Sequence, residues 1–229
     1  MNRLARGVRR FRTLAPVSQI LIVFLVVAIF AGGVWFFWPR PVPSNVDDIS
    51  VARVGPSDGT NIPAYVVAAQ RSLASLKGAT PIVALVSFRE YQTGSGAAAV
   101  LKGMPLRLAY AHVPIAGAQT RLTSFTAVSG RDLASGVVGL AAERTTTAGD
   151  LAAAGDTVGA DIARREAAAY RGGCACVYGV VVVAAPDSLR ALAGRSEVRA
   201  VEAAAEIRDP YSTVFRPLLP EDSGVVGVG

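Results

Sequence analysis

The sequence is poor in the residues that most often carry chemistry. It contains one histidine, His112, and two cysteines, Cys174 and Cys176, among 229 residues. It lacks a phosphate-binding loop, a dinucleotide-binding fingerprint and a zinc-ligand pattern. Enzymes usually need several polar groups that converge in one pocket, so these gaps argue against an enzyme. We therefore predict no catalytic residue, no cofactor and no metal site.

The single histidine is the residue on which any hydrolase would depend. His112 falls in an alternating, strand-like stretch, where a packed or hydrogen-bonded core histidine is the expected role. A catalytic triad would have to combine it with Ser87, Ser95 or Ser124. Ser95 is flanked by one glycine on each side, which differs from the Gly-x-Ser-x-Gly elbow. A hydrolase is therefore the weakest of the functions considered.

The two cysteines are separated by one residue, and three interpretations stay open. Cys174 and Cys176 are two small buried hydrophobic side chains, a strained or intermolecular disulfide, or part of a metal or redox site. The last needs further ligands in a chain that has a single histidine.

Acidic residues are missing from the first part of the chain, which starts with a basic tail. No acid precedes Asp47, and residues 1–14 contain five arginines. Residues 15–38 then carry no charge and end in an aromatic cluster. As a helix they would be roughly 36 Å long, enough to cross a bilayer core of about 30 Å.

The charge on either side of this apolar stretch predicts its orientation. We expect a cytoplasmic tail at 1–14, a single transmembrane helix at 15–38, and an extracytoplasmic C-terminal part anchored in the cell membrane. A cleavable signal peptide is the alternative, because small residues also occur within the apolar run.

The basic excess does not point to nucleic acid. The net charge is +6, and the five arginines of the tail together with Arg40 account for all of it. The remainder of the chain is close to neutral, unlike a surface that binds phosphates. We predict no nucleic-acid partner.

Beyond the apolar stretch, breaks in composition indicate further segments. Residues 39–62 are rich in Pro, Gly, Ser and Asp and predict a linker. Residues 63–208 predict one exported α+β domain, with an Ala-rich helical insertion at 131–171 that is either a hairpin or one long helix. Residues 209–229 predict an extended C-terminal tail.

Strand–helix–strand patterns occur twice in the predicted domain. The expected strands are 82–88 and 106–115 in the first unit, and 177–184 and 198–203 in the second. A further possible strand, 120–128, alternates more weakly. Two such βαβ units build a four-stranded ferredoxin-like sheet, so the predicted fold is a transmembrane helix followed by a ferredoxin-like domain.

Residues 177–203 also carry a resemblance. A valine-rich strand, a short helix with paired leucines and a strand ending in Val198-Arg-Ala-Val-Glu202 are similar to the strand–helix–strand unit of subtilase-propeptide and peptidase-inhibitor modules. The whole chain resembles uncharacterised single-pass membrane proteins of high-GC bacteria. This resemblance implies a location rather than an activity.

The expected function is a non-catalytic, membrane-anchored extracytoplasmic interaction module. Its partners would be the lipid bilayer and either another cell-envelope protein or a second copy of the chain, recognised by a polar face or an edge of the sheet. The alternative is an exported small-molecule binder or sensor that acts through a membrane partner.

Overall fold

The computed structural model describes residues 52–227. The predicted basic tail at 1–14, the predicted membrane span at 15–38 and the first part of the predicted linker lie outside the described residues. The first described element, β1 (Arg53–Val54), precedes the predicted domain boundary at residue 63.

Five strands form one sheet, in which every neighbouring pair is antiparallel. The strands are β2 (Ile82–Gln92), β3 (Leu106–Ala111), β4 (Thr123–Thr126), β5 (Val177–Ala184) and β6 (Val198–Ala204). Their order across the sheet is β4-β3-β5-β2-β6. The two strand–helix–strand units therefore interleave, and β4 and β6 form the edges of the sheet.

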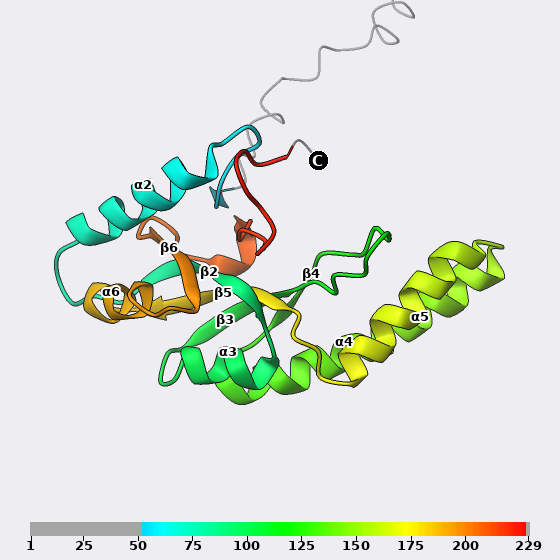
Figure 1. Ribbon diagram of the computed structural model, residues 1–229. Coiled ribbons are helices and arrows are strands. Elements are labelled where there is room, and N and C mark those ends of the chain that lie inside the picture. The colour runs from blue at the N-terminus through cyan, green and yellow to red at the C-terminus, as the bar shows by residue number, and fades with distance from the viewer. Residues whose placement is uncertain (1–51, 228–229) are drawn as a thin grey trace, which may run out of the picture. The chain divides into compact units, whose positions relative to one another are not determined.

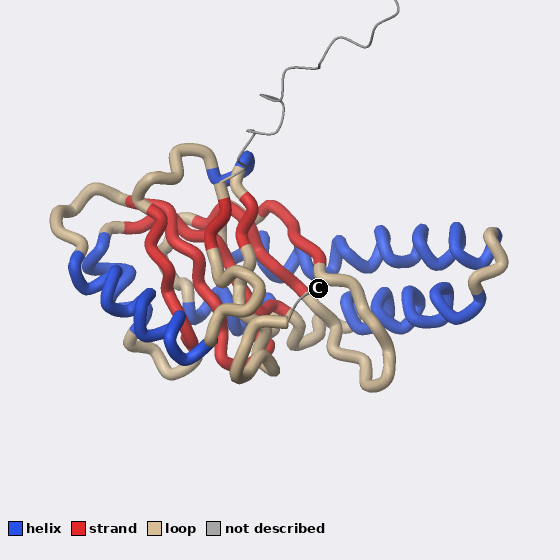
Figure 2. The backbone as a smooth tube through the Cα atoms, turned by 90° about the horizontal axis from the view of Figure 1, so that it is seen from above, coloured by secondary structure: helices blue, strands red, loops and turns tan. Residues whose placement is uncertain are grey.

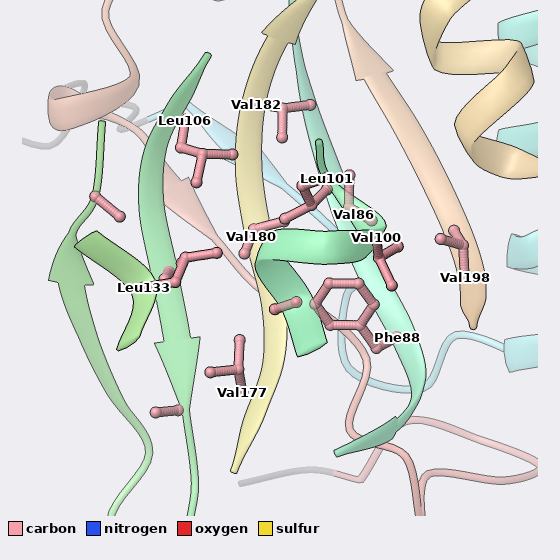
Figure 3. Close-up of a cluster of buried hydrophobic side chains, with 14 of the residues drawn as sticks. Val86, Phe88, Val100, Leu101, Leu106, Leu133, Val177, Val180, Val182 and Val198 are labelled. Atoms are coloured by element: carbon pink, nitrogen blue, oxygen red, sulfur yellow. The ribbon is translucent and has the colours of Figure 1, made fainter. Parts of the chain in front are cut away.

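Helices cover one face of this sheet. They are α3 (Gly94–Val100), α4 (Gly130–Ala153) and α6 (Pro186–Ala193), and α3 and α4 lie below the strands in Figure 1. Strand residues such as Phe88 and Val180 pack there against Val100 and Leu133 from the helices (Figure 3). Because β2 and β5 are central strands, their apolar runs are almost continuously buried.

The opposite face is covered by chain from both ends of the described part. β1 pairs in parallel with β7 (Val214–Phe215), which follows a short 3-10 helix, η2 (Pro210–Ser212). Residues 214–226, called here the C-terminal segment, lie over this face. Pro217 sits directly on Gly179, where any Cβ would overlap the proline ring. Part of the predicted tail at 209–229 is thus packed against the sheet, through Phe215, Pro217 and Leu218.

Helix α2 (Ile62–Ser75) packs beside the edge strand β6 and helix α6. The Asn61 side chain caps its first turn by accepting from the N–H of Ala64 at 3.0 Å. At its other end the Arg190 guanidinium donates to the carbonyls of Leu73 and Leu76, both at 3.1 Å. Helix α2 therefore covers the β6 edge and leaves β4 as the accessible edge.

The Ala-rich insertion is a helical hairpin, so the structure decides between the two predicted alternatives. Helix α4 runs antiparallel to α5 (Thr157–Arg171), and the distal part of the hairpin extends past the sheet (Figure 1, Figure 2). The turn between them is at 154–156, and Asp156 caps α5 by accepting from the N–H of Gly159 at 2.8 Å. Small side chains, among them Ala148 and Ala163, allow the two helices to approach closely.

The predicted fold is wrong in the form stated above. The sheet has five strands rather than four, because the weakly alternating stretch before α4 forms the edge strand β4. No helix within residues 52–227 is long and apolar enough to cross a membrane. The predictions of a single-pass protein and a signal anchor therefore find no support in the described helices, and the fold shown is an α+β domain with a five-stranded antiparallel sheet.

Candidate functional site

His112 connects three segments that are far apart in the sequence. Its Nδ1 lies 2.6 Å from the Tyr91 hydroxyl at the end of β2, and its Nε2 lies 2.6 Å from the Thr120 hydroxyl. The same Tyr91 hydroxyl donates to both carboxylate oxygens of Glu221, each at 2.9 Å. These contacts form one hydrogen-bonded network, called here the polar chain, which runs from the Thr120 hydroxyl through the His112 imidazole and the Tyr91 phenol to the Glu221 carboxylate.

Burial sets the electrostatics of this polar chain. It lowers the pKa of His112, while the carboxylates of Glu221 and Glu166 act in the opposite direction. Burial, assisted by the hydrogen bond to Glu221, raises the pKa of Tyr91. A neutral imidazole that donates from Nδ1 to the phenol oxygen and accepts from Thr120 at Nε2 satisfies every one of these contacts.

The arrangement does not reproduce a catalytic triad. The Tyr91 hydroxyl stands between imidazole and carboxylate, and the nearest Glu221 oxygen is 3.8 Å from Nδ1. The carboxylate thus does not orient the imidazole directly, as a triad requires. The contacts instead connect β2, the chain between β3 and β4, and the C-terminal segment.

None of the three serines considered as nucleophiles bonds to His112. Ser87 is buried and accepts from the N–H of Leu218 at 3.0 Å. Ser95 lies 3.2 Å from the Thr93 hydroxyl at the start of α3, and Ser124 is exposed on β4. The partners that the structure does supply, Tyr91, Thr120 and Glu221, follow no sequence spacing that would have revealed them.

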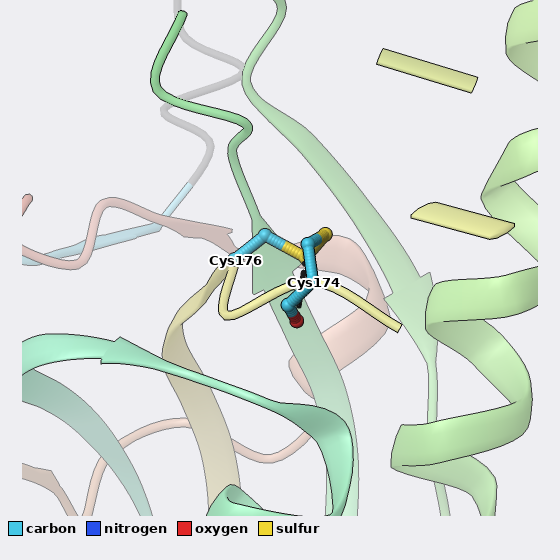
Figure 4. Close-up of a disulfide and its surroundings, with 2 residues drawn as sticks. All are labelled: Cys174 and Cys176. Carbon is cyan, nitrogen blue, oxygen red and sulfur yellow. Dashed lines mark hydrogen bonds between the residues drawn. A yellow bond between two sulfur atoms is a disulfide. The ribbon is translucent and has the colours of Figure 1, made fainter. Parts of the chain in front are cut away.

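The cysteines form an intramolecular disulfide, Cys174–Cys176 (Figure 4). Cys176 immediately precedes β5. Its N–H donates to the Gln92 carbonyl at 3.0 Å, and its carbonyl accepts from the His112 N–H at 2.8 Å. With both sulfurs in this bond, neither is free to bind a metal. No group of three His, Cys, Asp or Glu side chains suited to a metal ion occurs in the described part of the chain.

An open cavity of about 380 Å³ lies between the C-terminal segment and the β3–β4 side of the sheet. Its walls carry the aromatic rings of Tyr110, Tyr178 and Phe215. The rings of Tyr110 and Tyr178 meet edge to face at 6.2 Å, and burial raises the pKa of Tyr110 to about 12. Both phenols are therefore neutral hydrogen-bonding groups at physiological pH.

Comparisons with protein-family models, with curated proteins and with solved structures find no match to this chain.

The edge strand β4 borders the cavity, to which it contributes Thr123 and Ser124. Its pairing with β3 places Thr123, Ser124, Phe125 and Thr126 opposite residues 111 to 108. On the β4 side, the N–H of Ala127 donates to the Arg107 carbonyl. On the β5 side, the N–H of His112 donates to the Cys176 carbonyl. Since bonding directions alternate along a strand, the backbone N–H and C=O groups of Ser124 and Thr126 face away from β3.

The edge strand itself carries no charge, and apolar side chains stand at both of its ends. Leu122 and Val128 are 53% and 60% exposed. Natural sheets usually protect an edge with charges, proline or a covering element. At β4, the four residues of the strand include neither a charge nor a proline. Among residues 52–227, β3 is the only strand that pairs with β4, so the outer edge of β4 is open to a further strand.

Proposed function

We propose that this chain is a non-catalytic interaction module that binds an extended segment of another protein as a sixth strand beside β4. The observation that carries the proposal is the open edge, where the backbone groups of Ser124 and Thr126 face outward. Strand addition uses such groups for affinity and neighbouring pockets for specificity.

The surroundings of β4 support this use. The exposed side chains of Leu122 and Val128 offer apolar contact at both ends of the strand. The cavity beside Ser124 offers room for a side chain of the added strand. The edge is held in place from behind, because the Phe125 ring packs directly on Gly136 of α4.

We further propose that the domain works in an extracytoplasmic compartment, where its partner would be another protein of the cell envelope. The support is the Cys174–Cys176 disulfide, since disulfides persist mainly in oxidising compartments.

Site-specific crosslinking in cells tests the proposal. A photo-crosslinking amino acid at Val128, beside β4, should capture a defined partner protein from the full-length chain. The same amino acid at Val67 is the matched control, because this valine is 50% exposed on α2 but lies away from β4. Capture of the same proteins from both positions, or of none from Val128, would contradict strand addition at this edge.

A proline variant tests the backbone contacts themselves. Ser124→Pro removes an outward N–H and leaves the bonds between β3 and β4 in place. We expect it to abolish capture of the partner at Val128 while the melting temperature changes little. Phe125→Pro, which removes a bond to β3, should instead destabilise the fold. Undiminished capture by the Ser124 variant would argue against a backbone-mediated contact.

Small-molecule binding is the second candidate, and the aromatic cavity is the observation in its favour. Its volume of about 380 Å³ and its walls, which combine phenols and apolar side chains with the charged Arg216 and Asp222, suit a small polar ligand. A ligand that raises the melting temperature of the parent protein, and not that of a Tyr178→Ala variant, would support this function.

A further inference from the structure

We infer that the segment bound at β4 is acidic, an inference that rests on the proposed function and specifies its partner. The observation is an unequal distribution of charge. From Tyr91 to Arg131 the chain contains four basic residues, Lys102, Arg107, Arg121 and Arg131, and no acidic residue. This stretch builds α3, β3, β4 and the start of α4, and so includes both strands at the β4 side of the sheet.

Two of these arginines flank the edge strand. Arg121 is exposed and lies two residues before β4, or about 7 Å along an extended chain. Its backbone is anchored, because its N–H donates to a carboxylate oxygen of Glu166 at 2.9 Å. Arg131 is exposed in the first turn of α4, five residues after the strand. A strand added to β4 would therefore have a cation close to each of its ends.

Three acids lie near this edge, and each has a hydrogen-bond partner. Asp222 lines the cavity beside Ser124 and accepts from the N–H of Leu219 at 2.8 Å. Glu166 is fully buried and accepts twice from the Arg144 guanidinium. Asp132 accepts from the N–H groups of Val128 and Ser129. In contrast, Arg107, Arg121 and Arg131 form no ion pair with any residue between 52 and 227. Arg121 and Arg131 are exposed, so their charges are available to a ligand, whereas Arg107 is half-buried and donates to the Leu106 carbonyl at 2.7 Å.

Charge also decides between an acidic partner and a second copy of the chain. Pairing of β4 with β4 of another copy would place two basic surfaces against each other, and like charges in juxtaposition disfavour a complex. An extended segment with Asp or Glu on both sides of a short uncharged β-branched stretch would meet cations at both ends. Affinity for such a segment should fall as salt rises, because exposed charges are screened.

The test measures binding of fluorescent eight-residue peptides to the full-length protein. The peptides share one Val-Thr core and differ only in their flanks, which are Asp, Asn or Lys. We expect the Asp peptide to bind about tenfold more tightly than the Asn peptide at low salt, the Lys peptide to bind most weakly, and the differences to shrink at high salt.

Variants at one arginine connect the charge effect to this edge. Arg121→Glu should weaken binding of the Asp peptide about tenfold and leave the Asn peptide almost unchanged, and Arg121→Gln should have an intermediate effect without adding an acid near Glu166. The control is Arg71→Glu, which changes the net charge equally at an exposed position on α2. A matching loss in the Arg71 variant would show a general charge effect and overturn the inference.

The possible outcomes separate the two proposals. Equal affinity for the Asp and Asn peptides, abolished in both cases by Ser124→Pro, would retain strand addition and overturn the acidic partner. Absence of binding by all three peptides would count against both. Self-association that strengthens with salt and disappears in the Ser124 variant would identify a second copy as the occupant and also overturn the acidic partner.

Discussion

Glu166 on α5 and Arg121, which precedes β4, are joined by a hydrogen bond across 45 residues of sequence. One carboxylate oxygen of Glu166 accepts from the Arg121 N–H at 2.9 Å, and the other accepts from the Arg144 guanidinium at 2.8 and 2.5 Å. The base of the helical hairpin thereby holds the chain that leads into the edge strand. The hairpin and the proposed binding edge are parts of one structural unit.

Loss of one member of the Arg144–Glu166 pair should strongly destabilise the domain. Arg144→Ala leaves a buried carboxylate without its counterion, which typically costs about 3–5 kcal/mol. Replacing both residues by uncharged ones, as in Arg144→Met with Glu166→Gln, removes both charges and keeps an acceptor for the Arg121 N–H, so it should restore much of that loss. Urea unfolding of the two variants checks this prediction. A single variant as stable as the parent would show that the pair is not buried in solution.

Gly136 should not tolerate a side chain, whereas Gly139 in the same helix should. A Cβ at position 136 would overlap the Phe125 ring, so Gly136→Ala should cost about 1–3 kcal/mol by overpacking. Position 139 meets open space, and Gly139→Ala should stabilise α4 by up to about 1 kcal/mol. Thermal melting of both variants makes the comparison. Equal effects would contradict the observed contact between β4 and α4.

Stability should fall as the pH drops below about 7, in part because of His112. Its folded-state pKa lies below the ordinary value of about 6.5, so the unfolded chain takes up the proton first. The contribution of the neutral imidazole is therefore complete above pH 7 and is lost as the pH falls through 6.5 towards the folded-state pKa. Melting temperatures at pH 7.5 and 5.5 should differ less in His112→Gln than in the parent. If the melting temperature of His112→Gln falls as much between pH 7.5 and 5.5 as that of the parent, His112 does not contribute to the pH dependence of stability.

Removing the phenol hydroxyl tests the link between β2 and the C-terminal segment. Tyr91→Phe deletes the donor to Glu221 and the contact with His112, at an expected cost of about 0.5–1.5 kcal/mol. Hydrogen exchange should then accelerate in residues 214–226. Tyr211→Phe is the control, because this tyrosine is 57% exposed. Unchanged exchange in the Tyr91 variant would show that other contacts hold the segment.

Reduction of the disulfide should have only a modest effect on stability. The bond closes a loop of three residues, so the chain-entropy estimate for its contribution is about 1–2 kcal/mol. The free energy of unfolding measured with and without a reductant checks this. A loss above about 3 kcal/mol would mean that the bond stabilises the surrounding β5, α5 and β2 contacts as well.

Several elements follow from local sequence alone. The strands that start at Ile82 and Val177 agree with their predicted positions, and the short helix with paired leucines lies between 177 and 203 as expected. In each case the pattern is strong because a central strand or an amphipathic helix must bury its apolar residues wherever it lies. The alternation at 120–128 is weaker, since an edge strand buries less, and the pattern does not predict its place in the sheet.

The sequence alone determined the scarcity of residues that often carry chemistry, the excess of basic over acidic residues between 91 and 131, and the main strands. Tertiary structure decided what came from distant positions: the Tyr91–His112–Glu221 contacts, the disulfide, the hairpin turn at 154–156 and the open edge at β4. The physical reason is that such features depend on which segments become neighbours. Pairing of distant strands and packing of the C-terminal segment on Gly179 set those neighbours. Local periodicity reports which residues are buried and does not predict which distant segments they contact.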